Sequence, residues 1–380
     1  MSADADVQHL ARALQLAERG LNTADPNPRV GCVLVKDGQV IAEGWHERAG
    51  EPHAEAQALR AAGAQAAGCT AYVTLEPCSH TGRTPPCADA LIAAGVRRVV
   101  APGPDPNPRV AGMGFARLRA AGVEVGTGLL EREARALNPG FFSRFEHGRP
   151  WVRVKLGMSL DGRTALADGR SQWITGEAAR ADVQRWRARS SAILTGAGTA
   201  RADDPRLDVR WEYGSRVRQP LRVLLDPSLS VPHAARLFSG GQTLVFSGSD
   251  ALVPADYPAT VVRVPADRPA AGKQHGGAGP AGEQRGRLNL AAVLAALAQR
   301  EVNELLVEAG ARLAGAFVQA GLADELLLYV APALLGTAAR PLLDLAEPPD
   351  LPSAARFEYA DVRRIGDDLR LLLRARGGDT

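Results

Sequence analysis

Apolar and polar positions along the first 145 residues follow the periods of alternating helices and strands. From Asp6 to Arg19 apolar side chains recur at helical spacing, and Gly20 then ends the pattern. The apolar runs Val30–Val35 and Gln39–Trp45 flank Asp37-Gly38, a dipeptide that favours a two-residue hairpin turn. Further helices are predicted at 53–62 and 87–95, and further strands at 70–75 and 97–101. This alternation predicts a three-layer α/β domain.

A second α/β pattern follows a boundary near residues 145–150, where Gly148 and Pro150 precede the strand-like run WVRVKL. We therefore expect two domains, residues 1–147 and 148–380. The segment 265–287 is rich in Gly, Ala and Pro and nearly lacks large apolar side chains, so we expect a mobile surface insertion there. In the second domain, strands are predicted at 192–195, 221–226, 243–246, 304–307 and 325–330, helices at 177–189, 291–300 and 311–320, and a hairpin at 356–376.

The length and composition of the chain limit its class. With 380 residues the chain exceeds what a single core usually holds, and 46% hydrophobic residues are enough to fill two cores. The 45 basic and 42 acidic residues nearly cancel and only 5% of residues are aromatic, so a nucleic-acid partner is disfavoured. The N-terminal MSADADVQHL lacks the features of a secretory signal, and no apolar run is long enough to span a bilayer. We therefore expect a cytoplasmic protein.

The strongest chemical pattern is formed by His53, Glu55, Cys78 and Cys87, which lie in the segments HAE and PCSHTGRTPPC. One imidazole and two thiolates give Zn²⁺ three protein ligands and leave the fourth tetrahedral position to water, as in catalytic zinc sites. A glutamate two residues after the ligand histidine can reach that water and relay its proton without binding the metal. The residues therefore predict a zinc deaminase with Glu55 as the catalytic residue.

The long spacing between the two cysteines keeps a structural zinc site open as an alternative. Eight residues separate them, whereas the generic deaminase pattern has two. Glu55 argues against this alternative, because a structural site needs no general base. In the long loop, His80 and Arg83 suit substrate contact and solvent exposure equally well. Cys32 and Cys69 are expected to be buried thiols without a disulfide.

Longer motifs then carry a family resemblance over nearly the whole chain. PNPRVGCVLV (26–35), TLEPCSHTGRTPPC (74–87) and DPNPRVAGMG (105–114) resemble the deaminase half of the bifunctional deaminase-reductase family of riboflavin biosynthesis. The resemblance implies a cytidine-deaminase-like three-layer α/β/α domain followed by a dihydrofolate-reductase-like α/β domain. Four further segments resemble the reductase half of that family and occur in the expected order. They are KLGMSLDGRTA (155–165), SQWITG (171–176), RADDPRLDVR (201–210) and VEAGARLAGAFVQAGLADELLLYVAP (307–332).

The resemblance also implies ligands and site residues. Asn27 is implied to face the substrate of the deaminase, although a turn asparagine bonded to its own backbone is an equal alternative. The reductase half is implied to bind NADPH without the GxGxxG fingerprint, which the sequence lacks. The implied cofactor residues are Gly157, Trp173, Thr199, Asp203 and Gly310. The implied substrate residues of the reductase are Ser171, Arg187, Leu207, Arg210 and Glu308.

Ordinary structural roles are the alternative for the charged residues of the reductase half. Arg187 and Arg210 can hold a phosphate dianion by forked hydrogen bonds, but their positions also suit a charged helix face and a turn. Lys155, in an apolar strand-like run, suits either ligand contact or a strand lysine whose amine reaches solvent.

We therefore expect a hydrolase and oxidoreductase of riboflavin biosynthesis that uses Zn²⁺ and NADPH. Zinc-hydroxide deamination of 2,5-diamino-6-(5-phosphoribosylamino)pyrimidin-4(3H)-one comes first, and NADPH then reduces ribosyl to ribityl, giving 5-amino-6-(5-phosphoribitylamino)uracil. Expected partners are this small phosphoribosylated pyrimidine and further copies of the chain, in a dimer or tetramer, with neither nucleic acid nor membrane. The alternatives are a nucleoside or tRNA deaminase with a non-catalytic C-terminal domain, and a zinc-stabilised binding module without turnover.

Overall fold

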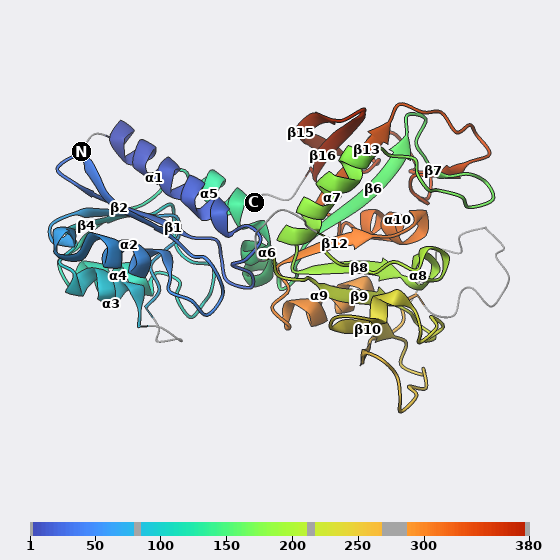
Figure 1. Ribbon diagram of the computed structural model, residues 1–380, viewed down its shortest axis with the longest axis horizontal. Helices are drawn as coiled ribbons and strands as arrows, with labels where there is room; N and C mark the ends of the chain where they lie inside the picture. Colours follow the sequence, from blue (N-terminus) through green and yellow to red (C-terminus); the bar gives the residue numbers. More distant parts are fainter. Residues whose placement is uncertain (1–2, 80–84, 211–216, 268–286, 377–380) are drawn as a thin grey trace. The chain divides into compact units, whose positions relative to one another are not determined.

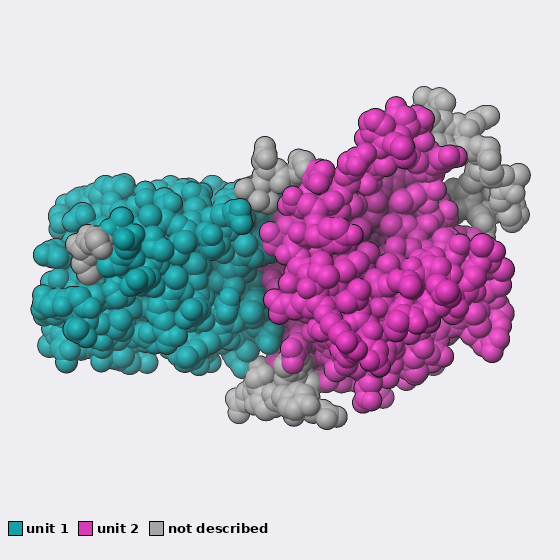
Figure 2. Space-filling model, turned by 90° about the horizontal axis from the view of Figure 1, so that it is seen from above, with its two compact units in different colours: residues 1–148, 380 teal, residues 149–379 magenta. Residues whose placement is uncertain are grey.

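A computed structural model describes residues 3–79, 85–210, 217–267 and 287–376 (Figure 1). The chain divides into two compact units, Met1–Gly148 and Arg149–Asp379 (Figure 2). His80, Arg83 and most of the expected insertion at 265–287 lie outside the described residues, so these expectations stay predictions. No helix in the described ranges is long and apolar enough to cross a membrane.

The first unit is built on a five-stranded sheet in the order β2-β1-β3-β4-β5. Its second strand in this order, β1 (Gly31–Lys36), pairs antiparallel with both neighbours, and β3, β4 and β5 run parallel to one another. The predicted hairpin forms, with Asp37 and Gly38 both at positive φ as a tight turn requires. The other strands are β2 (Gln39–Trp45), β3 (Thr70–Val73), β4 (Arg98–Val100) and β5 (Glu124–Gly126).

Helices cover both faces of this sheet, as Figure 1 shows. On one face α1 (Ala3–Ala17) buries Leu10, Ala13 and Leu16, whose spacing places them on one side of the helix. The other face is covered by α2 (Ala54–Ala62), α3 (Cys87–Ala93) and α4 (Met113–Ala120). The unit ends with α5 (Glu131–Leu137) and α6 (Pro139–His147). The predicted three-layer α/β/α fold is confirmed.

Two glycines set how closely the helices approach the first sheet. A Cβ atom at Gly31 would lie 2.0 Å from the carbonyl oxygen of Ala13 in α1. A Cβ atom at Gly44 would lie 2.4 Å from the carbonyl oxygen of Ala54 in α2. Because these neighbours are backbone atoms, only glycine lets each helix rest directly on its strand. The contact at Gly44 fixes the start of α2, immediately after His53.

The second unit is built on a nine-stranded sheet in the order β11-β10-β9-β8-β12-β6-β13-β16-β15. The strands from β11 to β13 in this order are parallel, and the predicted C-terminal hairpin adds β16 and β15 antiparallel at the edge. The strands are β6 (Trp151–Ser159), β8 (Ala192–Gly196), β9 (Leu221–Leu225), β10 (Thr243–Ser247), β11 (Thr260–Arg263), β12 (Glu304–Glu308), β13 (Glu325–Ala331), β15 (Phe357–Ile365) and β16 (Asp368–Ala375).

Helices cover both faces of the second sheet as well. On one face α9 (Leu290–Ala298) and α10 (Ala311–Gln319) bury Leu294 and Phe317 in an extensive apolar core. On the other face lie α7 (Glu177–Arg189) and α8 (Ala197–Asp203). A short pair of strands, β7 (Arg163–Ala165) and β14 (Arg340–Pro341), lies outside the main sheet. The α/β class predicted for this half is confirmed.

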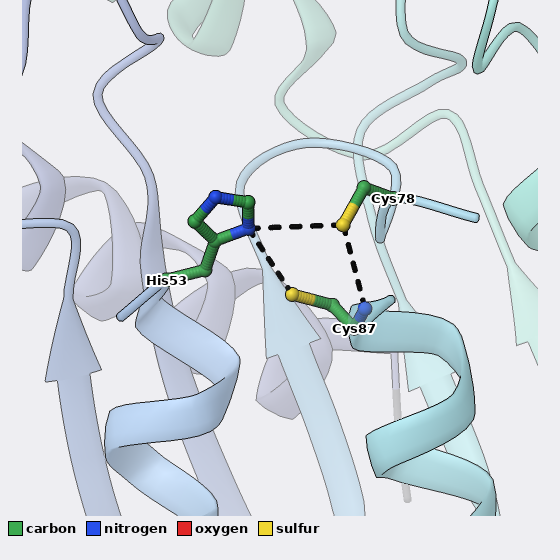
Figure 3. Close-up of side chains that lie close together, drawn as sticks. All are labelled: His53, Cys78 and Cys87. Carbon is green, nitrogen blue, oxygen red and sulfur yellow. Dashed lines mark hydrogen bonds between the residues drawn. The ribbon is translucent and has the colours of Figure 1, made fainter. Parts of the chain in front are cut away.

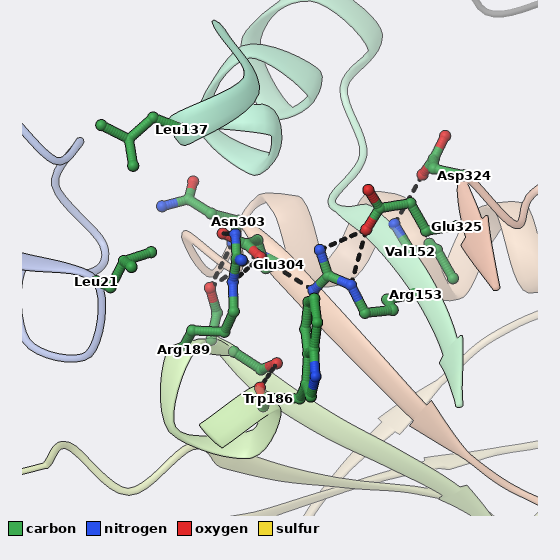
Figure 4. Close-up of polar contacts among 12 residues, drawn as sticks. Leu21, Leu137, Val152, Arg153, Trp186, Arg189, Asn303, Glu304, Asp324 and Glu325 are labelled. Carbon is green, nitrogen blue, oxygen red and sulfur yellow. Dashed lines mark hydrogen bonds and ion pairs between the residues drawn. The ribbon is translucent and has the colours of Figure 1, made fainter. Parts of the chain in front are cut away.

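A buried ion network lies at the amino-terminal ends of β6, β12 and β13 (Figure 4). Arg153 is 1% exposed and pairs with Glu304 at 3.1 Å and with Glu325 at 2.5 Å. Its guanidinium carbon lies 4.6 Å from the centre of the Trp186 ring, and Arg189 adds a second bond to Glu304. Because removing one partner leaves an uncompensated buried charge, this network fixes the amino-terminal end of the sheet. Ligand chemistry is then expected at the opposite, carboxyl edge.

Candidate functional site

Three side chains with metal-binding chemistry meet at the starts of two helices (Figure 3). His53 is the N-cap residue of α2, Cys87 is the first residue of α3, and Cys78 follows β3. The Nδ1 atom of His53 lies 3.3 Å from the Cys87 sulfur and 3.7 Å from the Cys78 sulfur. All three ligand atoms lie within 4.8 Å of one another, so they can share a single ion.

The donor set and its surroundings fit zinc. One imidazole nitrogen and two sulfurs are the ligands that zinc prefers. The Cys87 amide donates to the Cys78 sulfur at 3.4 Å, and hydrogen bonding to Cys87 holds the pKa of Cys78 well below its usual range. Within the described ranges no fourth histidine, cysteine or carboxylate joins the cluster. A tetrahedral ion held here would therefore keep one position for water.

Glu55 lies beside this cluster, two residues after His53 in α2. Its side chain is 3% exposed, and burial raises the pKa of its carboxyl. The carboxyl is hydrogen-bonded to Cys87 without being part of the ligand set. A raised pKa brings the carboxyl closer to neutral pH, where it can both take and return a proton. Since a structural zinc loop has no use for such a group, the arrangement favours a catalytic site.

Glu76 supports the metal centre and was missed in the sequence. Its buried carboxylate accepts three backbone hydrogen bonds, from the amides of Asp105 (3.0 Å), Gly112 (2.8 Å) and Phe115 (3.0 Å). The last two amides lie at the start of α4, so Glu76 caps that helix and fixes the chain two residues before Cys78. These partners lie 29 to 39 residues away along the chain, and no local pattern indicates them.

Asn27 lies close to the metal ligands through His46. Its Nδ2 atom is 3.0 Å from Nε2 of His46, and the ring of His46 packs edge-on against the ring of His53 with centroids 5.2 Å apart. The Asn27 side chain therefore bonds to another side chain, and does not serve only its own backbone as the alternative held. The two remaining cysteines, Cys32 and Cys69, are buried free thiols.

A second set of predicted residues lies at the carboxyl edge of the nine-stranded sheet. Glu308 is the last residue of β12, and in the sheet register it lies opposite Lys155 on the neighbouring strand β6. Burial alone would raise the pKa of Glu308, but Arg187 and Lys155 lower it to about 2. Burial also lowers the pKa of Lys155, whose amine has no hydrogen-bond partner among the described residues. A fixed carboxylate thus lies beside an amine that makes no hydrogen bond within the described residues.

Arg187 and Arg210, which were predicted to hold a phosphate together, differ in their surroundings. Arg187 is 9% exposed and makes a two-pronged ion pair with Glu308, at 2.6 and 2.9 Å. Its remaining nitrogen donates to the Asp208 carbonyl at 2.9 Å. The Arg210 side chain is 63% exposed and lies 3.9 Å from the Asp208 carboxylate, and Leu207 is buried at positive φ. Arg210 is therefore mostly exposed with one long ion pair, whereas Arg187 is buried and fully engaged.

The predicted cofactor residues come from separate segments near the same edge. The Gly310 amide, at the N-cap of α10, donates to the Thr199 hydroxyl of α8 at 3.2 Å, which joins two of them. Asp203, the last residue of α8, is exposed. A Cβ atom at Gly157 would touch Thr175 at 3.4 Å, so the chain before α7 passes over β6.

Ser171 and Trp173 lie in the segment that precedes α7. The indole of Trp173 is 68% exposed and stacks under Arg180, with the guanidinium carbon 4.5 Å from the ring centre. Ser171 is half-buried. Among the described residues, no hydrogen bond or ion pair joins either side chain to Thr199 or Gly310, and their cofactor and substrate roles stay predictions.

Family models match both halves of the chain. Residues 3–102 match the cytidine and deoxycytidylate deaminase zinc-binding region, and residues 150–371 match the RibD C-terminal domain. The first match includes the ligand set of the metal centre. The second includes the whole carboxyl edge from Lys155 to Glu308. The N-terminal unit is thus a cytidine-deaminase-like domain and the C-terminal unit a reductase domain with the dihydrofolate-reductase-like fold.

Individual relatives are similar over nearly their full length. The Escherichia coli K12 protein named riboflavin biosynthesis protein RibD is 48% identical, covering 97% of this chain and 99% of the relative. The solved structure of Acinetobacter baumannii RibD has a TM-score of 0.88 at 43% identity, covering 98% and 99% of the two chains. A Thermotoga maritima structure, named a diaminohydroxyphosphoribosylaminopyrimidine deaminase and 5-amino-6-(5-phosphoribosylamino)uracil reductase, has a TM-score of 0.81 at 31% identity with the same coverage.

Proposed function

Because the chain belongs to the RibD family, the bifunctional deaminase-reductases of riboflavin biosynthesis, we propose that it acts on the diaminopyrimidine named for the Thermotoga relative. Deamination of 2,5-diamino-6-(5-phosphoribosylamino)pyrimidin-4(3H)-one occurs in the first unit, and reduction of the ribosyl group in the second. The observation that carries the proposal is the three-ligand cluster with a buried, non-ligand carboxyl beside it, on a chain whose other half is a reductase domain.

In the deaminase half, His53, Cys78 and Cys87 would hold Zn²⁺. Bound there, zinc lowers the pKa of a water molecule and makes it a nucleophile near neutral pH. Glu55 accepts the proton of that water and returns it to the departing amino group, a task for which its burial and raised pKa are suited. Asn27 hydrogen-bonds the pyrimidine, and Glu76 keeps Cys78 in place.

In the reductase half, we propose that NADPH is the nicotinamide cofactor and supplies hydride to C1′ of the ring-opened ribose. Arg210, with Ser171 and Leu207, holds the sugar phosphate, and orientation by such contacts supplies much of the rate. Arg187 fixes Glu308 as a carboxylate facing the substrate. The cofactor is held by residues from the loops at the carboxyl edge, namely Gly157, Trp173, Thr199, Asp203 and Gly310.

The test supplies wild-type protein with the diaminopyrimidine phosphate and NADPH, and follows ammonia together with absorbance of the reduced cofactor. The proposal predicts one ammonia released and one NADPH oxidised per substrate, with zinc bound at one ion per chain. Cytidine, adenosine and tRNA serve as controls and are expected to release none. Ammonia from a nucleoside or tRNA without NADPH oxidation would instead support the alternative, which the match of the second half to a reductase domain disfavours.

Oligomeric state and location stay predictions from the sequence. A dimer or tetramer is measurable by light scattering of the purified chain. The cytoplasmic location is consistent with free thiols at Cys32 and Cys69.

A further inference from the structure

His46 is a buried side chain beside the metal ligands to which the mechanism assigns no task. It follows β2, is 2% exposed and packs edge-on against the ring of His53. Its two ring nitrogens face different partners. Nδ1 lies 3.2 Å from the carbonyl oxygen of Pro52, and Nε2 lies 3.0 Å from Nδ2 of Asn27.

These partners determine where the hydrogen of the His46 ring lies. A carbonyl oxygen can only accept, so Nδ1 carries the hydrogen and donates it to Pro52. With its hydrogen on Nδ1, the ring has a lone pair on Nε2, and the structure turns the Nδ2 atom of Asn27 toward that nitrogen at 3.0 Å. Nε2 therefore accepts a hydrogen bond from the Asn27 amide nitrogen. The opposite orientation of the amide would place two lone pairs against each other.

The orientation of Asn27 follows from this chain of bonds. With Nδ2 committed to His46, the carbonyl oxygen Oδ1 is turned away from the ring. Oδ1 has no hydrogen-bond partner among the described residues, and the side chain is only partly buried. This acceptor without a partner is thus separated from the metal ligand His53 only by the ring of His46.

We propose that His46 is a positioning residue: by accepting from Asn27, it presents the Asn27 carbonyl oxygen to the substrate, and so selects a pyrimidine that offers an N–H group there. The proposal rests on the proposed function, which places the pyrimidine at the metal centre. The diaminopyrimidinone carries such donors on its ring nitrogen and its amino groups. A ring nitrogen without hydrogen would meet the oxygen lone pairs and bind less well.

The test compares two replacements of similar size at the same position. His46→Gln retains an acceptor for the Asn27 amide, whereas His46→Met has none of comparable strength. His46→Met is expected to raise KM for ammonia release about tenfold, and His46→Gln by about threefold or less. Zinc per chain and reduction of pre-deaminated substrate, measured on the same preparations, are expected to be unchanged in both.

A double-mutant cycle with Asn27→Ala then separates positioning from other effects. If His46 acts through Asn27, His46→Met changes KM by less than about twofold in the Asn27→Ala background. An undiminished tenfold effect in that background, equal KM values for the two replacements, or loss of zinc in His46→Met would each overturn the proposal. If the wild-type protein deaminates the diaminopyrimidine but the His46 variants do not behave as expected, only the proposed role of His46 is overturned and the proposed function stands. An inactive wild type would overturn both.

Discussion

The metal centre of the first unit and the carboxyl edge of the second sheet are held in place by different forces. At the metal centre the main chain does most of the positioning, through two helix starts, the close contact under Gly44 and the amides bonded to Glu76. At the carboxyl edge, charged side chains do the positioning. There Arg187 fixes Glu308, which lies beside Lys155. A metal requires ligands at fixed distances, whereas a phosphorylated sugar and a dinucleotide are held by charged side chains. The two sites should therefore fail in different ways.

Loss of the metal is expected to have the largest effect and to separate the two halves completely. Cys87→Ala removes a ligand, so zinc per chain and ammonia release should both fall, the rate by at least about a hundredfold. Reduction of pre-deaminated substrate should be unchanged. Cys69→Ala, which removes a buried thiol outside the ligand set, is the matched control and should retain zinc and both activities. Equal ammonia release by the two variants would contradict a catalytic metal.

Two glutamates at opposite ends of β12 test the charge-based half of the comparison. Glu304 and Glu308 are both paired with arginines, but only Glu308 lies at the carboxyl edge. Glu308→Gln should lower the reductase kcat by about a hundredfold, because the fixed charge proposed to face the substrate is lost. Each change weakens a buried ion pair and should lower the free energy of unfolding by about 3 kcal/mol.

The decisive readout for this pair is the reductase rate per folded molecule. Glu304→Gln should keep it near the wild-type value despite the lost stability, and both variants should release ammonia normally. If the two variants lost reductase activity equally, the carboxyl edge would have no special role.

Gly44→Ala tests whether the main chain positions the metal ligands. The added methyl would meet the Ala54 carbonyl oxygen at 2.4 Å, so α2 must shift and carry His53 and Glu55 with it. We expect a loss of stability of about 1–3 kcal/mol and weaker zinc binding, measured by competition with a chelator. Gly103→Ala, which meets only a side chain at 3.5 Å, should leave zinc affinity unchanged. Unchanged affinity in Gly44→Ala would show that the contact does not position the ligands.

Asp105 gives the smallest expected effect, a change in how stability depends on pH. Burial raises its pKa from 3.8 to about 7. The folded state therefore favours the protonated form, and the resulting stabilisation is complete below pH 3.8 and lost as the pH rises through about 7. Asp105→Asn should remove this loss, so the melting temperature of the variant relative to wild type should rise between pH 5 and pH 8. A difference that does not depend on pH in that interval would contradict the assignment.

The sequence predicted the metal centre, because its residues lie in short segments whose residue types and spacing indicate the chemistry. The ligands and Glu55 were predicted because their residue types and spacing are those of a zinc deaminase, and the structure brings them together. The α/β class of both halves was confirmed, since long periodic segments such as α1, α7 and β13 show their type directly. The roles of the reductase residues stay predictions, because they came only from the resemblance.

What the sequence did not predict depends on contacts between distant segments or on short elements. Arg187 and Glu308 were both expected to face the substrate, but their mutual ion pair spans 121 residues and leaves no periodic trace. The hydrogen bonds of Glu76 also join distant parts of the chain, so no local pattern predicts them. The helices α4 and α8 were also missed, because each has only seven or eight residues and too few apolar positions to define a face. The half-exposed strand β11 was missed for a similar reason.

The most direct test of the account is the rate of ammonia release by Glu55→Gln, measured with zinc content on the same preparation. The account predicts one zinc per chain, a deaminase rate lowered by at least about a hundredfold, and normal NADPH-dependent reduction of pre-deaminated substrate. Glu55 would then be needed for the proton and not for the metal. Wild-type ammonia release by this variant would contradict the central claim that the buried carboxyl beside the metal centre performs the deamination chemistry.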